Sequence, residues 1–443
     1  AGVKSGEISQ EELDRNVRNM LEYIVKTPRF KGYKFSNKPD TDAHAALVRK
    51  AGAEGMVLLK NNGVLPLKGD EKVGLFGVTS YDFIAGGTGS GNVNKKYIRN
   101  VQEGLEGNGV TVDPAPASWY KKYIAYTEET MANNGAGGGW GKPVLPEAEL
   151  SLNFVKRVEA NTDVAVLTIG RNAGEGGDRY AKDGDWTLTG QERELMQNLA
   201  DIYHAAGKKF IVVLNIGGVI ETASWKHIPD AVLLAWTPGQ EGGYAVADIL
   251  CGKANPSGKL PMTFLRDAGQ APFYYNHNNS GRPNNGTETL LYDIPIAAGQ
   301  TSLGCTSYYL DTGYGPLFPF GYGLSYTSFK YGNPVLDKGE YTENDVIRVS
   351  FELKNTGMRE GTEVVQLYVQ DKVGSVVRPV KELKGFQRVT LAPGETKTLT
   401  FELPVSDLAF WNIDMEYVVE KGDFNLWVAG DSASGEPVSF EVI

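Results

Sequence analysis

The sequence has little cysteine and histidine, no excess of basic residues and no long apolar run. Its 443 residues include only two cysteines, Cys251 and Cys305, and four scattered histidines, which excludes a disulfide scaffold and predicts no metal site. Lysine and arginine total 44 against 54 acidic residues, a net charge of −10, which argues against a nucleic-acid partner. No run approaches the ~18 consecutive apolar residues of a membrane-spanning helix, so we expect no membrane partner.

Glycine and tyrosine are plentiful, with 54 and 22 residues. Glycine allows tight turns and close approach of the backbone to a ligand, and aromatic rings provide stacking surfaces. The composition therefore favours a loop-rich chain with polar, aromatic binding surfaces.

The first 40 residues contain one well-marked helix. Ser9 and Glu12 form the capping-box pattern S-Q-E-E. The apolar residues that follow recur at helical spacing and form one stripe: Leu13, Val17, Met20, Leu21 and Ile24. Two interpretations of the stripe stay open: it packs on later parts of the chain, or it closes a domain outside these residues.

The middle of the chain predicts an α/β fold. Short apolar runs alternate with helical patterns, at residues 73–78, 110–112, 164–169, 210–214 and 231–235. The runs are continuous rather than alternating, which is typical of parallel strands covered on both faces. A second capping box, at 189–192, marks the start of one of the helices.

The pattern changes after about residue 330, where apolar and polar residues alternate. The period of two is clear at 347–353, 399–403 and 424–428, and turn sequences lie at 355–357 and 393–395. Such strands and turns predict an immunoglobulin-like β-sandwich.

The residues with the most chemical content follow the apolar run at 164–169 and read G-R-N-A-G-E-G-G-D-R-Y (170–180). Ligands of open α/β sheets bind beyond the carboxyl ends of the strands. Glycines beside Glu175 let the backbone approach a substrate, and burial would raise the pKa of this carboxyl and suit it to general acid catalysis. A surface glutamate in a glycine-rich turn is the alternative, and we assign Asp178, Asp183 and Asp185 nearby to structural roles.

A second glycine cluster, A-G-G-T-G-S-G (85–91), follows the apolar run at 73–78. It lacks the Lys of a phosphate-binding loop, since Asn92 follows Gly91, and it lacks the spacing of a dinucleotide fingerprint. We expect it on the same rim as Glu175, with the Thr88 and Ser90 hydroxyls facing a polyol; a plain tight turn is the alternative. A third glycine stretch, 133–142, contains Trp140, which like Tyr180 and Trp186 is a candidate for stacking on a sugar.

Several strings in the chain are typical of one enzyme family. They occur in the family's order and cover almost the whole sequence: E-G-M-V-L-L-K-N-N-G-V-L-P-L (54–67), G-G-T-G-S-G (86–91), G-E-G-G-D-R (174–179), N-I-G-G-V-I-E-T-A-S-W (215–225), W-T-P-G-Q-E-G-G (236–243), N-P-S-G-K-L-P-M-T-F (255–264), F-P-F-G-Y-G-L-S-Y-T (318–327) and R-P-V-K-E-L-K-G-F (378–386). Together they resemble family 3 glycoside hydrolases, the β-glucosidase-like members.

The resemblance implies a six-stranded, mostly parallel α/β sandwich over 41–330 and a fibronectin type III-like domain over 331–443. Residues 1–40 resemble the last helix and linker of the family's (β/α)8 barrel. Glu175 occupies the acid/base position of a retaining enzyme. Retention requires a second carboxylate about 5 to 5.5 Å away, which the resemblance assigns to an Asp on the barrel, outside these residues.

The implied partners are an oligosaccharide or an aryl or alkyl β-glycoside, together with the barrel or a complementary chain. The candidate substrate-binding residues are Thr88, Ser90, Asp178, Arg179, Tyr180 and Trp140, with Asp178 and Arg179 also interpretable as an ion pair that fixes the loop. No cofactor is implied, and a periplasmic or secreted location is favoured. We expect the 443 residues alone to be inactive. The alternatives are a noncatalytic carbohydrate-binding or assembly fragment and a β-xylosidase-type member of the family.

Overall fold

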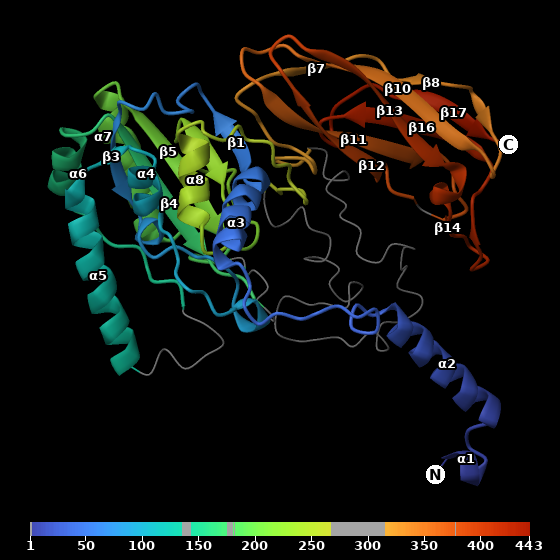
Figure 1. The fold of residues 1–443 in the computed structure, drawn as a ribbon. Coiled ribbons are helices and arrows are strands. Elements are labelled where there is room, and N and C mark those ends of the chain that lie inside the picture. Colours follow the sequence, from blue (N-terminus) through green and yellow to red (C-terminus); the bar gives the residue numbers. More distant parts are fainter. Residues whose placement is uncertain (1, 135–142, 175–179, 181, 267–314, 377) are drawn as a thin grey trace. The chain divides into compact units, whose positions relative to one another are not determined.

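The computed structural model describes residues 2–134, 143–174, 180, 182–266, 315–376 and 378–443 (Figure 1). These form two units, Ala1–Ala45 and Ala46–Ile443. The first contains helices α1 (Gly2–Ser5) and α2 (Gln10–Lys26). The predicted capping box is confirmed, because the Glu12 amide donates to Ser9 Oγ over 3.1 Å and the Ser9 amide donates to the Glu12 carboxylate over 2.9 Å. No residue of α2 is buried.

The second unit begins with a six-stranded sheet in the order β1-β6-β5-β4-β2-β3. Its strands are β1 (Val57–Asn61), β2 (Lys72–Phe76), β3 (Thr111–Val112), β4 (Val164–Arg171), β5 (Lys209–Ile216) and β6 (Ala231–Leu234). All neighbours pair in parallel except the edge strand β1, which is antiparallel to β6. Every residue of β4 is buried, as expected for a continuous apolar strand with both faces covered.

Helices cover both faces of this sheet (Figure 1). They are α3 (Thr41–Gly55), α4 (Val101–Gly107), α5 (Pro114–Asn133), α6 (Leu152–Glu159), α7 (Gly190–Ala205) and α8 (Gly242–Leu250). Alternate strand residues, such as Val166 and Leu167, enter opposite cores: α3, α4, α5 and α8 pack on one face and α6 and α7 on the other. The predicted α/β layers are therefore confirmed.

The remaining strands form a β-sandwich. One sheet has the order β13-β10-β7, with β8 also on β10, the other has the order β12-β11-β16-β17-β9, and β14 and β15 pair as a hairpin. The strands are β7 (Phe329–Tyr331), β8 (Val335–Leu336), β9 (Glu340–Tyr341), β10 (Val346–Asn355), β11 (Gly361–Asp371), β12 (Glu382–Leu391), β13 (Thr396–Pro404), β14 (Phe410–Trp411), β15 (Tyr417–Val418), β16 (Gly422–Ala429) and β17 (Val438–Val442). The alternating apolar residues of β10 and β16 are buried in one core between the sheets, as the period of two predicts.

Buried polar contacts join the sandwich to the α/β part of the same unit. Lys259 Nζ lies 2.9 Å from the Glu363 carboxylate of β11, and both side chains are almost fully buried. Gln366, also on β11, donates to the carbonyl of Gly321 over 3.2 Å. Among the helices in the described ranges, none has both the length and the apolar character needed to cross a bilayer.

Candidate functional site

The carboxyl ends of β2 and β4 are joined by close backbone contacts. β2 is followed by Gly77, whose φ of 94° lies in the region that favours glycine, and a Cβ there would lie 2.3 Å from the Thr168 carbonyl oxygen of β4. A short 3-10 turn, η1 (Val78–Ser80), follows, and Thr79 Oγ1 donates to that same carbonyl over 3.0 Å. The turn is thereby held against the end of β4.

The glycine cluster after β2 pairs with the loop after β4, so the two loops lie side by side at the same edge of the sheet. The Thr88 amide donates to the Ala173 carbonyl over 2.9 Å, and Thr88 and Gly174 form a parallel bridge. Side chains would prevent this approach: a Cβ on Gly87 would lie 2.6 Å from the Ala173 oxygen, and one on Gly174 would collide with the Thr88 side chain. Gly174 directly precedes Glu175, so the chain is anchored up to the residue before the proposed acid.

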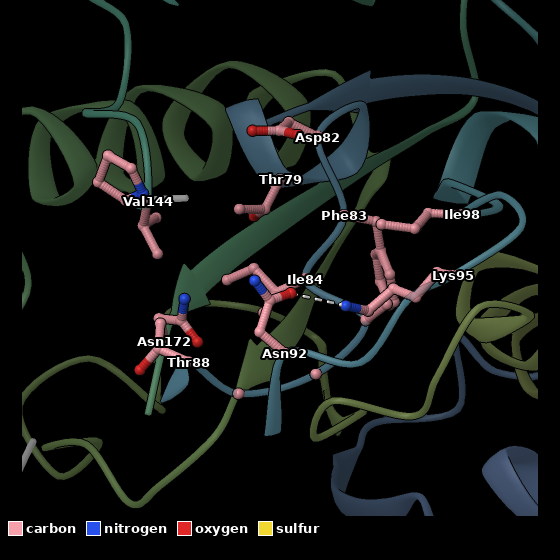
Figure 2. Close-up of a pocket in the computed structure, with 14 residues that line it drawn as sticks. Thr79, Asp82, Phe83, Ile84, Thr88, Asn92, Lys95, Ile98, Val144 and Asn172 are labelled. Atoms are coloured by element: carbon pink, nitrogen blue, oxygen red, sulfur yellow. Dashed lines mark hydrogen bonds between the residues drawn. The ribbon is translucent and has the colours of Figure 1, made fainter. Parts of the chain in front are cut away.

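A pocket of about 110 Å³ opens beside these paired loops (Figure 2). In this view Val144 and Asn172 lie on one side of the pocket and Lys95 and Ile98 on the other, with Thr79 between them. Lys95 Nζ donates to Asn92 Oδ1 over 3.0 Å. The other lining residues are Asp82, Phe83, Ile84, Ala85, Gly86, Gly87, Thr88 and Pro143. The pocket thus combines hydroxyl, amide, carboxylate and ammonium groups with apolar walls, a mixture suited to a polyol.

Two of the expected ligand-binding hydroxyls lie in this region. Thr88 lines the pocket and is half-buried, whereas Ser90 is exposed in the short turn η2 (Gly89–Gly91). Tyr180 is 48% exposed, and Lys182 Nζ lies 5.3 Å from the centre of its ring. The other predicted residues lie outside the described residues: Glu175, Asp178, Arg179 and Trp140.

Arg171 organises the chain that returns from this loop. It ends β4, is buried, and places both terminal nitrogens 2.6 Å from the Glu192 carboxylate. It also donates to the carbonyls of Asp185 and Thr187, each over 3.2 Å. Because Glu192 caps α7 through the Thr189 amide, one ion pair connects a strand end, a loop and a helix start. Charged bidentate bonds of this kind are strong and geometrically specific.

Asp183 and Asp185, the carboxylates nearest to Tyr180 in the described sequence, have structural partners. Asp183 pairs with Arg193 over 2.6 Å and accepts from Thr187 Oγ1 over 2.8 Å, and these bonds lower its pKa. Asp185 accepts from the Tyr180 amide over 2.9 Å. These contacts agree with the structural roles expected for both residues.

Asn215 was not predicted to matter, yet it joins the end of β5 to the segments that follow β2 and β6. It is fully buried at the end of β5, and its amide accepts from the Ile84 amide over 2.7 Å and donates to the carbonyls of Ile84 and Trp236, over 2.9 and 2.7 Å. The available signal was a polar amide at the end of an apolar run, because a buried amide needs partners. Asn215 therefore positions the pocket wall at Ile84.

Glu147 is a second residue that the sequence did not single out. Its carboxylate accepts from the Val78 amide over 3.0 Å, the Ala148 amide over 2.9 Å and the Tyr120 hydroxyl over 3.0 Å. Burial raises the pKa of Glu147 to about 7, although these hydrogen bonds act in the opposite direction. Glu147 thus fixes the segment after Pro143 against the turn η1, which contains the pocket residue Thr79.

Comparison with known proteins identifies the family. A model described as the glycosyl hydrolase family 3 C-terminal domain matches residues 56–326, and one described as a fibronectin type III-like domain matches residues 363–432. The chain is 33% identical over a 466-residue alignment to the periplasmic beta-glucosidase of Salmonella typhimurium, with 100% of this chain and 57% of that protein covered. It is 40% identical over 279 residues to a beta-xylosidase of Formosa agariphila, with 62% of this chain and 35% of that protein covered.

A solved structure shows the same likeness in three dimensions. Beta-glucosidase 3B from Thermotoga neapolitana, in complex with glucose, matches with a TM-score of 0.87 and 38% identity over 99% of this chain and 60% of that one. The chain therefore belongs to glycoside hydrolase family 3, and the predicted α/β sandwich and fibronectin type III-like fold are confirmed. It spans a little over half the length of the Salmonella relative.

Proposed function

We propose that the chain supplies the general acid/base side of the active site of a retaining, exo-acting β-glucosidase, which removes terminal non-reducing β-D-glucosyl residues. The observation that supports this proposal most directly is the bridge between Thr88 and Gly174. It holds the residue before Glu175 beside loop 86–91, at the edge of a parallel sheet where ligands bind. The relatives named beta-glucosidases support the choice of substrate.

In the proposed reaction Glu175 acts first as an acid and then as a base. It donates its proton to the glycosidic oxygen as the bond from that oxygen to C1 breaks, while a carboxylate attacks C1 and forms a glycosyl-enzyme. In the second step the Glu175 carboxylate removes a proton from water, the water oxygen bonds to C1, and the nucleophile leaves. We assign the nucleophile to an Asp on a (β/α)8 barrel outside these 443 residues.

The remaining predicted residues would bind the sugar. The hydroxyls of Thr88 and Ser90 donate and accept hydrogen bonds, as sugar hydroxyls do. Tyr180 and Trp140 offer aromatic faces to the C–H face of a pyranose. Asp178 and Arg179 would either bind hydroxyls or pair with each other and fix the loop. Neither metal nor organic cofactor has a role in these steps.

The test uses the chain assembled with a family 3 barrel and an aryl β-glucoside that has a good leaving group. Removing the acid with Glu175→Ala leaves formation of the glycosyl-enzyme fast, because such a leaving group needs little protonation, but it removes the base for hydrolysis. We expect kcat to fall by at least about 100-fold. Azide needs no base, so added azide should restore turnover and release β-glucosyl azide.

Glu194→Ala is the matched control, because Glu194 is exposed on α7 and lies outside the pocket. It should leave kcat and azide sensitivity unchanged. Normal turnover of Glu175→Ala on substrates with poor leaving groups, without an azide product, would contradict the proposal. Turnover by the 443 residues alone would instead show that the nucleophile lies within them.

A β-xylosidase activity is the second candidate, favoured by the 40% identity to the Formosa agariphila protein. A xylosyl unit differs from a glucosyl unit by the missing hydroxymethyl group. The ratio of kcat/KM for the 4-nitrophenyl β-glucoside and β-xyloside distinguishes the two. A ratio above one supports the β-glucosidase assignment.

A further inference from the structure

A second pocket lies between α5 and α6, away from the paired glycine loops. Its volume is about 310 Å³, and its lining includes Trp119 of α5, Phe154 and Arg157 of α6, and Glu149. This volume lies at the lower end of the range of roughly 300–1,000 Å³ for small-ligand sites. We propose that it is an accessory binding site for a pyranose unit of a β-linked gluco-oligosaccharide.

Aromatic side chains form the base of the pocket and are held in place by one another. Trp119 stacks on Tyr123 with ring centres 5.4 Å apart and planes 15° from parallel, and its ring centre lies 6.4 Å from that of Phe154. Both Trp119 and Phe154 are half-buried. Rings fixed in this way lose little entropy when the flat, apolar face of a β-pyranose packs on them.

Polar side chains around the rings match sugar hydroxyls. In the ranges described, the side chains of Glu149, Asn153 and Arg157 make no hydrogen bond or ion pair, and the Arg157 guanidinium lies 5.3 Å from the centre of the Phe154 ring. The Glu149 carboxylate accepts hydrogen bonds, the Arg157 guanidinium donates them, and the Asn153 amide can do either. Neighbouring hydroxyls of one sugar can use all three.

The charges of the lining select against other ligands. The Glu149 carboxylate opposes an anion, and the net charge of −10 opposes it at longer range. The Arg157 guanidinium opposes a cation in the same way. A neutral ligand with both an apolar face and several hydroxyls therefore fits best.

The second pocket is also connected to the first. Pro143 and Val144 line the first pocket, Glu147 is bonded to Val78 and Tyr120, and Glu149 lines the second. Glu149 follows Val144 by five positions along the chain, so the two residues lie at most about 18 Å apart. A bound oligosaccharide would therefore raise the local substrate concentration near the first pocket. This use, and the choice of a β-glucan ligand, rest on the proposed function.

The test is isothermal titration calorimetry of the 443-residue chain with cellotetraose. Arg157→Ala removes an exposed donor and Trp119→Ala removes the stacking face, and each should weaken binding by about fivefold or more. The matched controls are Lys156→Ala, exposed on α6, and Tyr126→Ala, 70% exposed on α5; neither residue lines the pocket, so both should bind like the wild type. Circular dichroism checks that each variant folds. If Trp119→Ala does not fold, the result for Arg157→Ala decides.

Absence of binding by the wild-type chain at 10 mM cellotetraose would overturn the accessory site. Wild-type affinity in Arg157→Ala would also overturn it. The experiment is separate from the test of Glu175, because binding by the chain alone needs no nucleophile. Loss of the azide effect with binding intact would refute the proposed function only, whereas loss of binding with azide rescue intact would refute the accessory site only.

Discussion

The carboxyl group of Glu147 is buried and accepts three hydrogen bonds, as a buried polar group needs partners. The amides of Val78 and Ala148 and the hydroxyl of Tyr120 all donate to it, and they favour its charged form. Burial acts against the charge and prevails, so the pKa of Glu147 rises to about 7. The same burial, with the nearby Glu147 charge, raises the pKa of Tyr120 well above its ordinary value.

The raised pKa of Glu147 predicts a pH-dependent stability. The ordinary pKa of a glutamate side chain is 4.5 and the pKa of Glu147 in the folded protein is about 7, so between these pH values the folded state binds more protons than the unfolded state. Stability from this group is therefore complete below pH 4.5 and is lost as the pH rises to 7, by up to about 3 kcal/mol. Urea unfolding at several pH values measures it.

Glu147→Gln removes the titration, so the free energy of unfolding should depend less on pH between 4.5 and 7 than in the wild type. Glu194→Gln, at an exposed site on α7, is the control and should retain the wild-type slope. An unchanged slope in Glu147→Gln would assign the pH dependence to other groups.

Single residues were predicted where their partners are close in sequence. The capping pairs Ser9 with Glu12 and Thr189 with Glu192 are three residues apart, and both are confirmed. Asn215 was missed because its partner Ile84 lies 131 residues away. Only the fold brings Ile84, which lies eight residues after β2, next to the end of β5, and no local pattern encodes that contact.

At the scale of elements, the Arg171 and Glu192 ion pair joins the end of β4 to the start of α7. Both side chains are more than nine-tenths buried, with exposures of 6% and 8%. A buried charge without its partner is costly, whereas an exposed pair contributes little. The exposed pair of Arg193 and Asp183, 2.6 Å apart with exposures of 49% and 60%, provides a comparison in the same region.

A double-mutant cycle should separate the two pairs. Arg171→Met leaves the Glu192 carboxylate buried and unpaired, and we expect a loss of about 3–5 kcal/mol. Adding Glu192→Gln removes that charge, so the double variant should be more stable than the sum of the single changes predicts, by about 2 kcal/mol. The same cycle with Arg193→Met and Asp183→Asn should give a much smaller coupling in urea unfolding, because solvent screens this exposed pair. Equal couplings for the two pairs would contradict this account.

The strands were predictable because their apolar patterns differ. Continuous runs mark β2, β4, β5 and β6, and alternation marks β10, β13 and β16, as the burial of their residues confirms. In β3, Thr111 is exposed and only Val112 is buried. The antiparallel direction of β1 was not predictable, because its apolar run resembles the runs of the parallel strands in the same sheet. Thr88 pairs with Gly174 because β2 and β4 are neighbours in the sheet. A short sequence motif does not specify which strands are neighbours.

At the scale of the whole molecule, some sequence motifs shared with the family contain no candidate catalytic residue and instead form the junction between the α/β part and the β-sandwich. Asn255 and Lys259 belong to N-P-S-G-K-L-P, and Gly321 to F-P-F-G-Y-G. Asn255 donates to the Glu360 carbonyl over 2.9 Å, and a Cβ on Gly321 would lie 2.0 Å from Gln366 Oε1. Such contacts between parts distant in sequence could not be read from the strings, and the domain limits at residues 40 and 330 stay predictions.

The most buried charge contact of this junction joins Lys259 to Glu363. The side chains are 14% and 7% exposed, and Tyr331 also donates to the Glu363 carboxylate over 3.0 Å. Burial raises the pKa of Glu363, while the Lys259 ammonium acts to lower it. Within the described residues, neither side chain forms another ion pair, so the pair links the stability of the two parts.

Lys259→Met should weaken this link and leave a buried carboxylate. We expect the free energy of unfolding to fall by about 3–5 kcal/mol at pH 7, and by less near pH 4, where protonation of Glu363 removes the unpaired charge. Differential scanning calorimetry should then resolve separate transitions for the α/β part and the sandwich. Lys354→Met, at an exposed position of β10, is the control and should melt like the wild type. A Lys259→Met variant that melts in the wild-type manner at both pH values would show that the apolar and backbone contacts of the junction suffice to couple the two parts.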